Sequence, residues 1–259
     1  MEGRTPLFLA TELEEVEIMA MLIAHAADPG VPNLKGETCL NALVGKNNEE
    51  ALNILLSKGT SILNIKDPNS NGRTPLIKAI LSDDSTMAGL LLAQSGTMVD
   101  LQDNDGKSAL MFSVEYQRSS ITEQLLKLGA HVNQTDKKGQ TALHTACLLM
   151  DSGAIQQLAD RTANVTALDA AGVSPLHCLV KKIVEEPNAG DDVVENIESC
   201  IRIIHKVYNN PKSREDMEAE KSQRDRGKTA ENILNTQDGQ GNTILHLLAT
   251  CWQQVSFSY

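Results

Sequence analysis

A short motif that opens with glycine recurs along most of the chain, and this recurrence constrains the fold more than any other feature. Each copy reads Gly-x-Thr/Ser-x-Leu. The copies begin at Gly3, Gly36, Gly72, Gly106, Gly139, Gly172 and Gly241. Successive glycines lie 33, 36, 34, 33, 33 and 69 residues apart. Such a period indicates stacked supersecondary units, each of which buries its apolar face against its neighbours.

A second landmark keeps the same period. In five copies a small residue follows a leucine-rich segment 23 or 24 residues after the opening glycine, at Ala26, Gly59, Gly96, Gly129 and Thr162. The Thr or Ser of the motif predicts a helix start, because its side chain can cap the helix. Polar pairs such as Asn47-Asn48 end this first helix, and a second helix follows with Leu at helical spacing. Gly59, Gly96 and Gly129 are suited to a left-handed C-cap of the second helix, and an Asp- or Asn-rich turn then leads to the next glycine.

This unit of helix, turn, helix and finger resembles the ankyrin repeat, over roughly residues 1–208 and 236–252. The resemblance implies an all-α solenoid of helix-turn-helix units with short β-hairpin fingers. It places repeats 1 to 6 in residues 1–208 and a partial seventh in 236–259. The family's histidine is matched by His144, His177 and His246, and the resemblance implies that it bonds the finger backbone. Repeats 1 to 4 carry Phe8, Asn41, Ile77 and Met111 instead.

The pattern is interrupted once and is incomplete at both ends. An amphipathic segment over 193–208 is interpreted as the second helix of repeat 6. Residues 209–235 form a charged insertion that we expect to be mobile, either a solvated loop or a partner-binding or phosphorylatable loop around Ser213 and Ser222. Both ends look cut, which suggests an isoform, a fragment, or an end covered by another chain. Self-association through uncapped ends is an open alternative.

Composition narrows the function classes. The formal net charge is −11 and aromatic residues make up 3% of the chain, which argues against binding to nucleic acid. No apolar run is long enough for membrane insertion, and no signal peptide precedes the first repeat. The five cysteines show no CxxC spacing, so we expect an intracellular location, cytoplasmic or nuclear.

No catalytic, cofactor-binding or metal-ligating constellation is predicted. Gly227-Lys228-Thr229 lacks the earlier glycine of a phosphate-binding loop, because Ser222 stands there. A calcium loop around Asp103 and Asp105 would lack carboxylates at its first and last positions. His144 and Cys147 lie close in sequence, but a zinc site needs four converging ligands. We therefore expect a protein that is not an enzyme, requires no cofactor and binds another protein.

The resemblance implies that this partner contacts the finger tips and the exposed side of the first helices. The predicted partner-binding residues are Leu81, Asn104, Asp105, Lys107, Glu115, Tyr116, Lys137, Lys138, Gln140, Leu148, Leu149, Lys181 and Lys182. Tyr116, Leu148 and Leu149 are expected to be neighbours in an apolar patch, or else to pack under a finger or insertion. The lysines either attract an acidic peptide or are simply solvated.

The sequence favours an adaptor or scaffold and leaves two alternatives open. The number of repeats and the acidic charge are similar to those of inhibitors of Rel-type transcription factors. A basic partner and strongly salt-dependent binding would favour that alternative. The other alternative is the recognition part of a larger enzyme or channel.

Overall fold

The computed structural model describes residues 2–57, 59–185, 237, 238, 241 and 243. The chain divides into two compact units, residues 1–130 and residues 131–259, and each is considered by itself.

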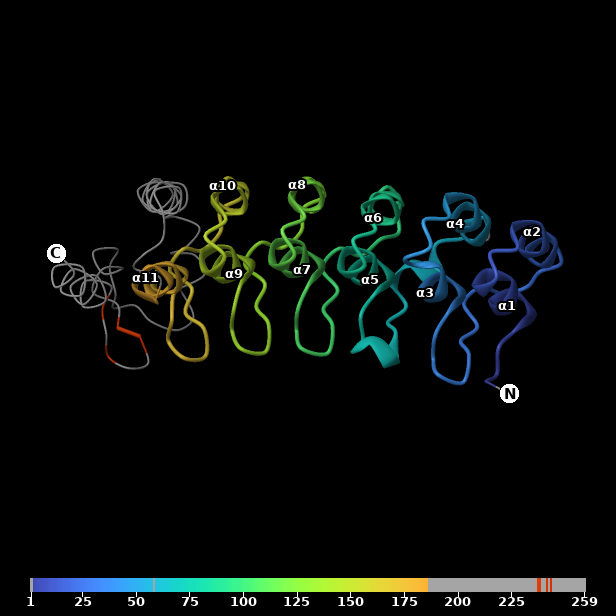
Figure 1. Cartoon of the computed structure of the whole chain (residues 1–259), viewed down its shortest axis with the longest axis horizontal. Coiled ribbons are helices and arrows are strands. Elements are labelled where there is room, and N and C mark those ends of the chain that lie inside the picture. The colour runs from blue at the N-terminus through green and yellow to red at the C-terminus, as the bar shows by residue number, and fades with distance from the viewer. Residues whose placement is uncertain (1, 58, 186–236, 239–240, 242, 244–259) are drawn as a thin grey trace. The chain divides into compact units, whose positions relative to one another are not determined.

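Unit 1 is built from four helix pairs. In chain order the pairs are α1 (Pro6–Glu12) with α2 (Val16–Ala24), α3 (Cys39–Leu43) with α4 (Glu49–Leu56), α5 (Pro75–Leu81) with α6 (Ser85–Leu92), and α7 (Ala109–Glu115) with α8 (Ser119–Lys127). Two short 3₁₀ helices, η1 (Ser61–Asn64) and η2 (Pro68–Ser70), lie between α4 and α5. The first helices form one layer beside the fingers, and the second helices form an outer layer (Figure 1). Each first helix contacts the next first helix, as α5 contacts α7.

The motif residues start the first helices as the sequence predicts. Thr5, Thr38, Thr74 and Ser108 each accept a hydrogen bond from the backbone N–H three residues later. This bond satisfies one of the helix's otherwise unpaired donors. The predicted breaks are also confirmed, because Asn48 and Asp84 cap α4 and α6 in the same way.

The core of unit 1 lies between the two helix layers and between successive pairs. Met19, Leu52, Leu55, Met87 and Leu125 are at most 1% exposed. They come from the second helices α2, α4, α6 and α8. Burial of such apolar side chains is the main term that stabilises a stack of repeats, since each pair has little core of its own.

Unit 2 repeats this plan in its described part. Its helices are α9 (Ala142–Leu148), α10 (Ser152–Ala159) and α11 (Pro175–Glu185). Helix α9 packs against both α10 and α11. The all-α fold of helix-turn-helix units is thus confirmed, whereas the expectations for 193–208, 209–235 and most of 236–259 lie outside the described residues.

The fingers differ from the predicted β-hairpins. Among the described residues no finger contains a β-strand, and single antiparallel bridges occur at Asp67–Arg73, Gln102–Ser108 and Gln237–Thr243. Backbone hydrogen bonds close the turn of these fingers between residues four to six positions apart, and among the described residues the pairing does not extend into a ladder. Asp103 N–H, for example, donates to Lys107 O over 2.9 Å.

One of the predicted C-cap glycines has another role. Gly59 and Gly129 have positive φ angles, as predicted, but Gly96 does not. A Cβ on Gly96 would lie 2.5 Å from Thr60 Oγ1. Glycine is needed at position 96 because another segment approaches its Cα closely, not because the backbone is left-handed.

Candidate functional site

In the fingers one Asp or Asn side chain accepts hydrogen bonds from backbone N–H groups of the same finger. Asp103 Oδ1 accepts hydrogen bonds of 2.9 Å from the N–H groups of Asp105 and Lys107. Asp136 Oδ1 does the same for Lys138 and Gln140, at 2.8 and 2.9 Å. In both fingers the Asp side chain closes the turn by accepting hydrogen bonds from backbone N–H groups two and four residues later, as expected of an Asx turn.

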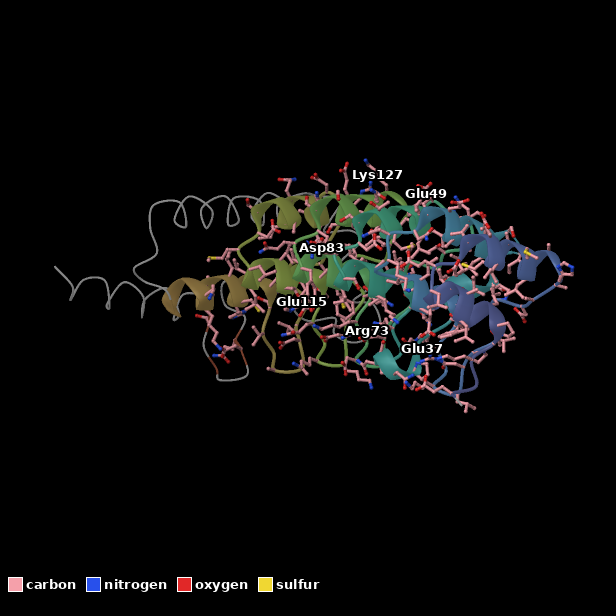
Figure 2. All side chains as sticks on the ribbon, turned by 45° about the vertical axis from the view of Figure 1, so that its right-hand side comes forward. Glu37, Glu49, Arg73, Asp83, Glu115 and Lys127 are labelled. Carbon is pink, nitrogen blue, oxygen red and sulfur yellow. The ribbon has the colours of Figure 1, made fainter. Side chains whose placement is uncertain are left out.

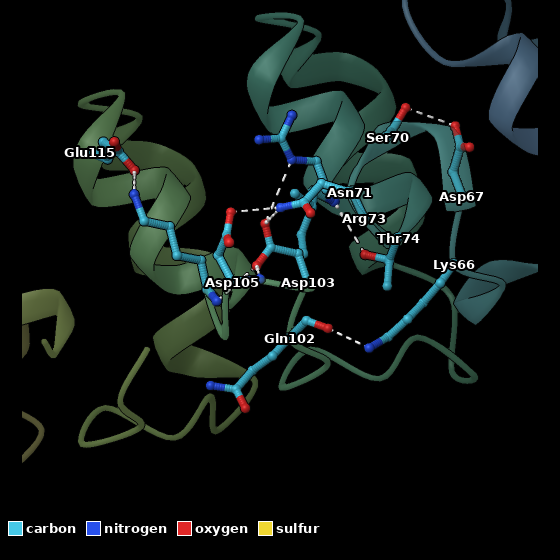
Figure 3. Close-up of polar contacts among 12 residues, drawn as sticks. Lys66, Asp67, Ser70, Asn71, Arg73, Thr74, Gln102, Asp103, Asp105 and Glu115 are labelled. Atoms are coloured by element: carbon cyan, nitrogen blue, oxygen red, sulfur yellow. Dashed lines mark hydrogen bonds and ion pairs between the residues drawn. The ribbon is translucent and has the colours of Figure 1, made fainter. Parts of the chain in front are cut away.

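Neighbouring fingers of unit 1 are joined tip to tip. Asn104 N–H donates to the carbonyl of Asn71 over 2.8 Å, and Asn71 Nδ2 donates to Asp105 Oδ2 over 2.7 Å (Figure 3). Lys66 also donates to the carbonyl of Gln102. Asn104 and Asp105, both predicted to bind a partner, are exposed but already take part in this framework.

Two further predicted binding residues neutralise each other. Lys107 Nζ lies 2.7 Å from Glu115 Oε2 and 5.5 Å from the centre of the Phe112 ring. Repeat 1 has the same pair in the same register, with Arg4 and Glu12 3.1 Å apart. This contact between finger and helix is not among the sequence-based predictions. The signal was present, because opposite charges recur at the second and tenth positions of both repeats.

The predicted apolar residues of unit 1 lie at the ends of first helices. Leu81 ends α5 and is half-buried, whereas Tyr116 follows α7 and is 44% exposed. The Tyr116 ring lies 6.5 Å from the Phe112 ring. The Arg73 guanidinium lies over the Phe112 ring, 5.3 Å from the ring centre. Figure 2 shows Arg73 and Glu115 on the finger side of the unit and Lys127 on the outer-helix side.

Several of the predicted binding residues of unit 2 are exposed to solvent. Leu148 and Leu149 end α9 and are 39% and 38% exposed. Lys137 and Lys138 occupy the finger tip, are exposed, and form no ion pair with a described residue. The other predicted residues are Gln140, Lys181 and Lys182.

These three residues complete the predicted surface of unit 2. Gln140 Nε2 donates to Asp169 Oδ2 over 3.3 Å, which ties its finger to the next one. Lys181 is exposed and Lys182 is half-buried. They lie on α11 at the same repeat positions that Leu148 and Leu149 hold on α9, and α11 packs against α9. The expected proximity of Tyr116 to Leu148 joins residues of two units, so it stays a prediction.

The repeat histidine has the structural role that the resemblance implies. Thr141 N–H donates to His144 Nδ1 over 3.1 Å, so the proton is on Nε2, which donates to the carbonyl of Val173 over 3.1 Å. Burial lowers the pKa of His144 below its ordinary value. At the same position in repeat 2, Asn41 is buried, and neither side-chain atom of its amide has a hydrogen-bond partner among the described residues.

Burial governs the chemistry of the cysteines that the structure describes. The cysteines Cys39, Cys147 and Cys178 are buried and reduced. Burial raises the pKa of the Cys39 and Cys178 thiols to about 11, so these thiols are protonated and unreactive at neutral pH. Within the described residues, no group of three or more His, Cys, Asp or Glu side chains is placed to hold a metal ion.

A groove of about 790 Å³ lies elsewhere on unit 1, between the outer helices α2 and α4. Its walls include Ala20, Ile23, Glu50 and Ile54. The groove belongs to the outer layer and contains none of the predicted binding residues.

Among the described helices, none is both long enough and apolar enough to cross a bilayer.

Comparison with known proteins identifies the repeats. Residues 2–34 match the family model "Ankyrin repeat", and residues 60–136 match the model "Ankyrin repeats (3 copies)". The phosphocholine transferase AnkX of Legionella pneumophila is 29% identical over 109 residues, and Rabankyrin-5 of Homo sapiens is 25% identical over 132 residues. These matches cover 41% and 51% of this chain, but only 11% of the length of either relative.

Solved structures show the same fold. The ankyrin repeat domain of Bcl-3, described as a member of the IkappaB protein family, has a TM-score of 0.63 at 24% identity. The match covers 76% of this chain and 83% of that domain. An ankyrin repeat domain of Acinetobacter baumannii has a TM-score of 0.65 at 20% identity, with 76% and 97% covered. At these identities the likeness shows the fold alone. Ankyrin repeats are in general protein-interaction modules.

Proposed function

The chain belongs to the ankyrin repeat family, and we propose that it is a non-catalytic protein-binding module, an adaptor or scaffold, whose partner contacts the finger tips and the first helices. The observation that carries the proposal is the exposed pair Leu148 and Leu149. Apolar side chains that lie together on an exposed surface commonly mark a place where another protein binds.

The charges beside this pair suggest the chemistry of the partner. In the finger at residues 136–140 the Asp136 carboxylate accepts hydrogen bonds from backbone N–H groups, while Lys137 and Lys138 at the tip are exposed. In unit 1, by contrast, Lys107 is paired with Glu115. We therefore propose a partner segment that carries apolar side chains next to acidic ones, with the acids directed toward the fingers of unit 2.

An intracellular location is part of this proposal. The support comes from three buried free thiols, Cys39, Cys147 and Cys178, which suit a reducing compartment. A recognition segment of a larger enzyme is a second candidate, because one relative is named a phosphocholine transferase and the match spans 11% of it. The binding surface would be the same in both cases.

The double variant Tyr116→Ala/Leu149→Asp is expected to lose the partner that the wild-type chain captures from a cell lysate. A carboxylate at position 149 would be desolvated in the interface, and the exposed Tyr116 ring would be missing from it. Capture followed by quantitative mass spectrometry should show at least about a tenfold lower recovery, which corresponds to about 1.4 kcal/mol.

The matched control for this experiment is Leu128→Asp. Leu128 is 52% exposed and directly follows the outer helix α8, away from the fingers. This variant should recover the partner as the wild type does, with unchanged helical circular dichroism in both variants. Equal recovery by the double variant and the wild type would refute the proposed surface. Recovery that falls steeply with salt, with a basic partner, would instead favour the Rel-inhibitor alternative.

A further inference from the structure

The first repeat exposes apolar side chains at positions that are buried in the other repeats of unit 1. Ile18 on α2 is 47% exposed, whereas the residues at the same repeat position, Ala51, Met87 and Ile121, are at most 2% exposed. In repeats 2 and 4 the preceding helix pair covers this position, since α4 packs against α2 and α8 against α6. Ile18 therefore belongs to the face of repeat 1 on which a preceding pair would stack.

Two more positions show the same difference. Pro6 is exposed, whereas Cys39, Pro75 and Ala109 are buried at its position. Leu22 is half-buried, whereas Leu55, Leu91 and Leu125 are at most 1% exposed. The end of a repeat stack is ordinarily closed by polar side chains on its outer face. The N-terminal face, which we define as Pro6, Ile18 and Leu22, instead has the apolar composition of an internal repeat interface.

The backbone ahead of this face also has the form of an internal repeat. Glu2 precedes Gly3, as Asn71 precedes Gly72. The carbonyl of Glu2 accepts a hydrogen bond from Leu34 N–H over 2.9 Å, just as that of Asn71 accepts one from Asn104 N–H over 2.8 Å. Gly3 has a φ of 65°, close to the 69° of Gly72. Residues 2–5 thus adopt the second half of a finger and continue the register of the stack.

The charges near this face disfavour a second copy of the chain packed face to face. Glu15 and Glu17 are exposed at the end of the turn between α1 and α2 and at the start of α2. In a symmetric dimer through this face, these acids would approach the same acids of the other copy, and like charges at short range repel.

We infer that the N-terminal face of unit 1 receives a further ankyrin-type helix pair, stacked in the register in which α1 and α2 precede α3 and α4. The incoming pair would bury Pro6, Ile18 and Leu22 with its own apolar face. Its finger would run into Glu2 and complete the half-finger. This surface is separate from the one proposed for partner binding and stands independently of it.

The inference is tested by joining one ankyrin-type helix pair, with its finger, ahead of Glu2 in the full chain. The midpoint temperature of unfolding is expected to rise by at least about 5 °C, because the added pair buries the N-terminal face. The same fusion in an Ile18→Glu chain is expected to show no rise, because the new carboxylate would be buried without a partner. Without the fusion, Ile18→Glu should leave the midpoint within about 1 °C, as expected for an exposed residue.

Three results would overturn the inference. The fusion could leave the midpoint temperature unchanged, or raise it equally in the wild-type and Ile18→Glu chains. The third result is a dimer of the chain without the fusion, detected by analytical ultracentrifugation and abolished by Ile18→Glu. That result would assign the face to a second copy of the chain. A monomer in that measurement, together with an Ile18-dependent rise, is the expected outcome.

Discussion

Replacement of His144 by Leu is expected to lower the free energy of unfolding by about 2–4 kcal/mol at pH 7.5. The side chain is fully buried and connects the start of α9 to the next finger, through Thr141 N–H and the carbonyl of Val173. Leucine can fill the space but cannot make either hydrogen bond. Each buried group left without its bond costs about 1–3 kcal/mol. Urea denaturation followed by circular dichroism measures the difference.

The effect of His144→Leu should also depend on pH. Burial holds the pKa of His144 below its ordinary value, so the unfolded chain takes up the proton first as the pH falls. The stability that His144 contributes is therefore fully present above about pH 6.5 and is lost as the pH falls below that value. We expect a smaller difference between the wild type and His144→Leu at pH 5.5 than at pH 7.5.

The control for this prediction is His25→Leu. His25 is exposed after α2 and bonds only to the carbonyl of Met21 among the described contacts. This change should alter the free energy of unfolding by no more than about 0.5 kcal/mol at either pH. Equal effects at positions 25 and 144, or a larger loss for His144→Leu at pH 5.5, would contradict the role assigned to His144.

Substitution of Gly139 by Ala is expected to destabilise the chain by about 2–5 kcal/mol. Gly139 has a φ of 76°, and a Cβ there would lie 2.9 Å from the backbone nitrogen of Ala170. The left-handed conformation alone costs an alanine about 1–2 kcal/mol. The overlap adds about 1–3 kcal/mol, because the backbone of the next finger must move. That movement would also weaken the 2.8 Å bond from Ala170 N–H to the carbonyl of Lys138.

Gly129→Ala separates these two contributions. Gly129 has a similar φ of 83°, but a Cβ there would have no atom within 4 Å. Only the conformational cost of about 1–2 kcal/mol should remain. If urea denaturation shows equal losses for both substitutions, the close contact between the fingers does not contribute to stability.

The repeat pattern in the sequence was sufficient to predict the helices, because each landmark has a local cause. Thr5 and Ser108 cap helices through bonds to residues three positions later. Such short-range chemistry can be read from one repeat. Gly96 was misjudged for the opposite reason. Its role depends on Thr60, which lies in the previous repeat and approaches only when the repeats are stacked.

The candidate site was less predictable. The exposed ends of first helices follow from the repeat register, and Tyr116, Leu148 and Leu149 are indeed exposed. The pairing of Lys107 with Glu115 depends on how the finger folds back onto α7, which single positions do not reveal. The exposed Ile18 was missed for a related reason, because its significance appears only when its burial is compared with that of Ala51, Met87 and Ile121.

Hydrogen exchange of the chain, alone and bound to the captured partner, tests the proposed binding surface most directly. The account predicts slower amide exchange in the fingers at residues 103–107 and 136–140 and in helix α9 (Ala142–Leu148). The outer helices α8 (Ser119–Lys127) and α10 (Ser152–Ala159) should exchange at unchanged rates. Slower exchange confined to the outer helices, including α2 and α4 around their groove, would contradict it.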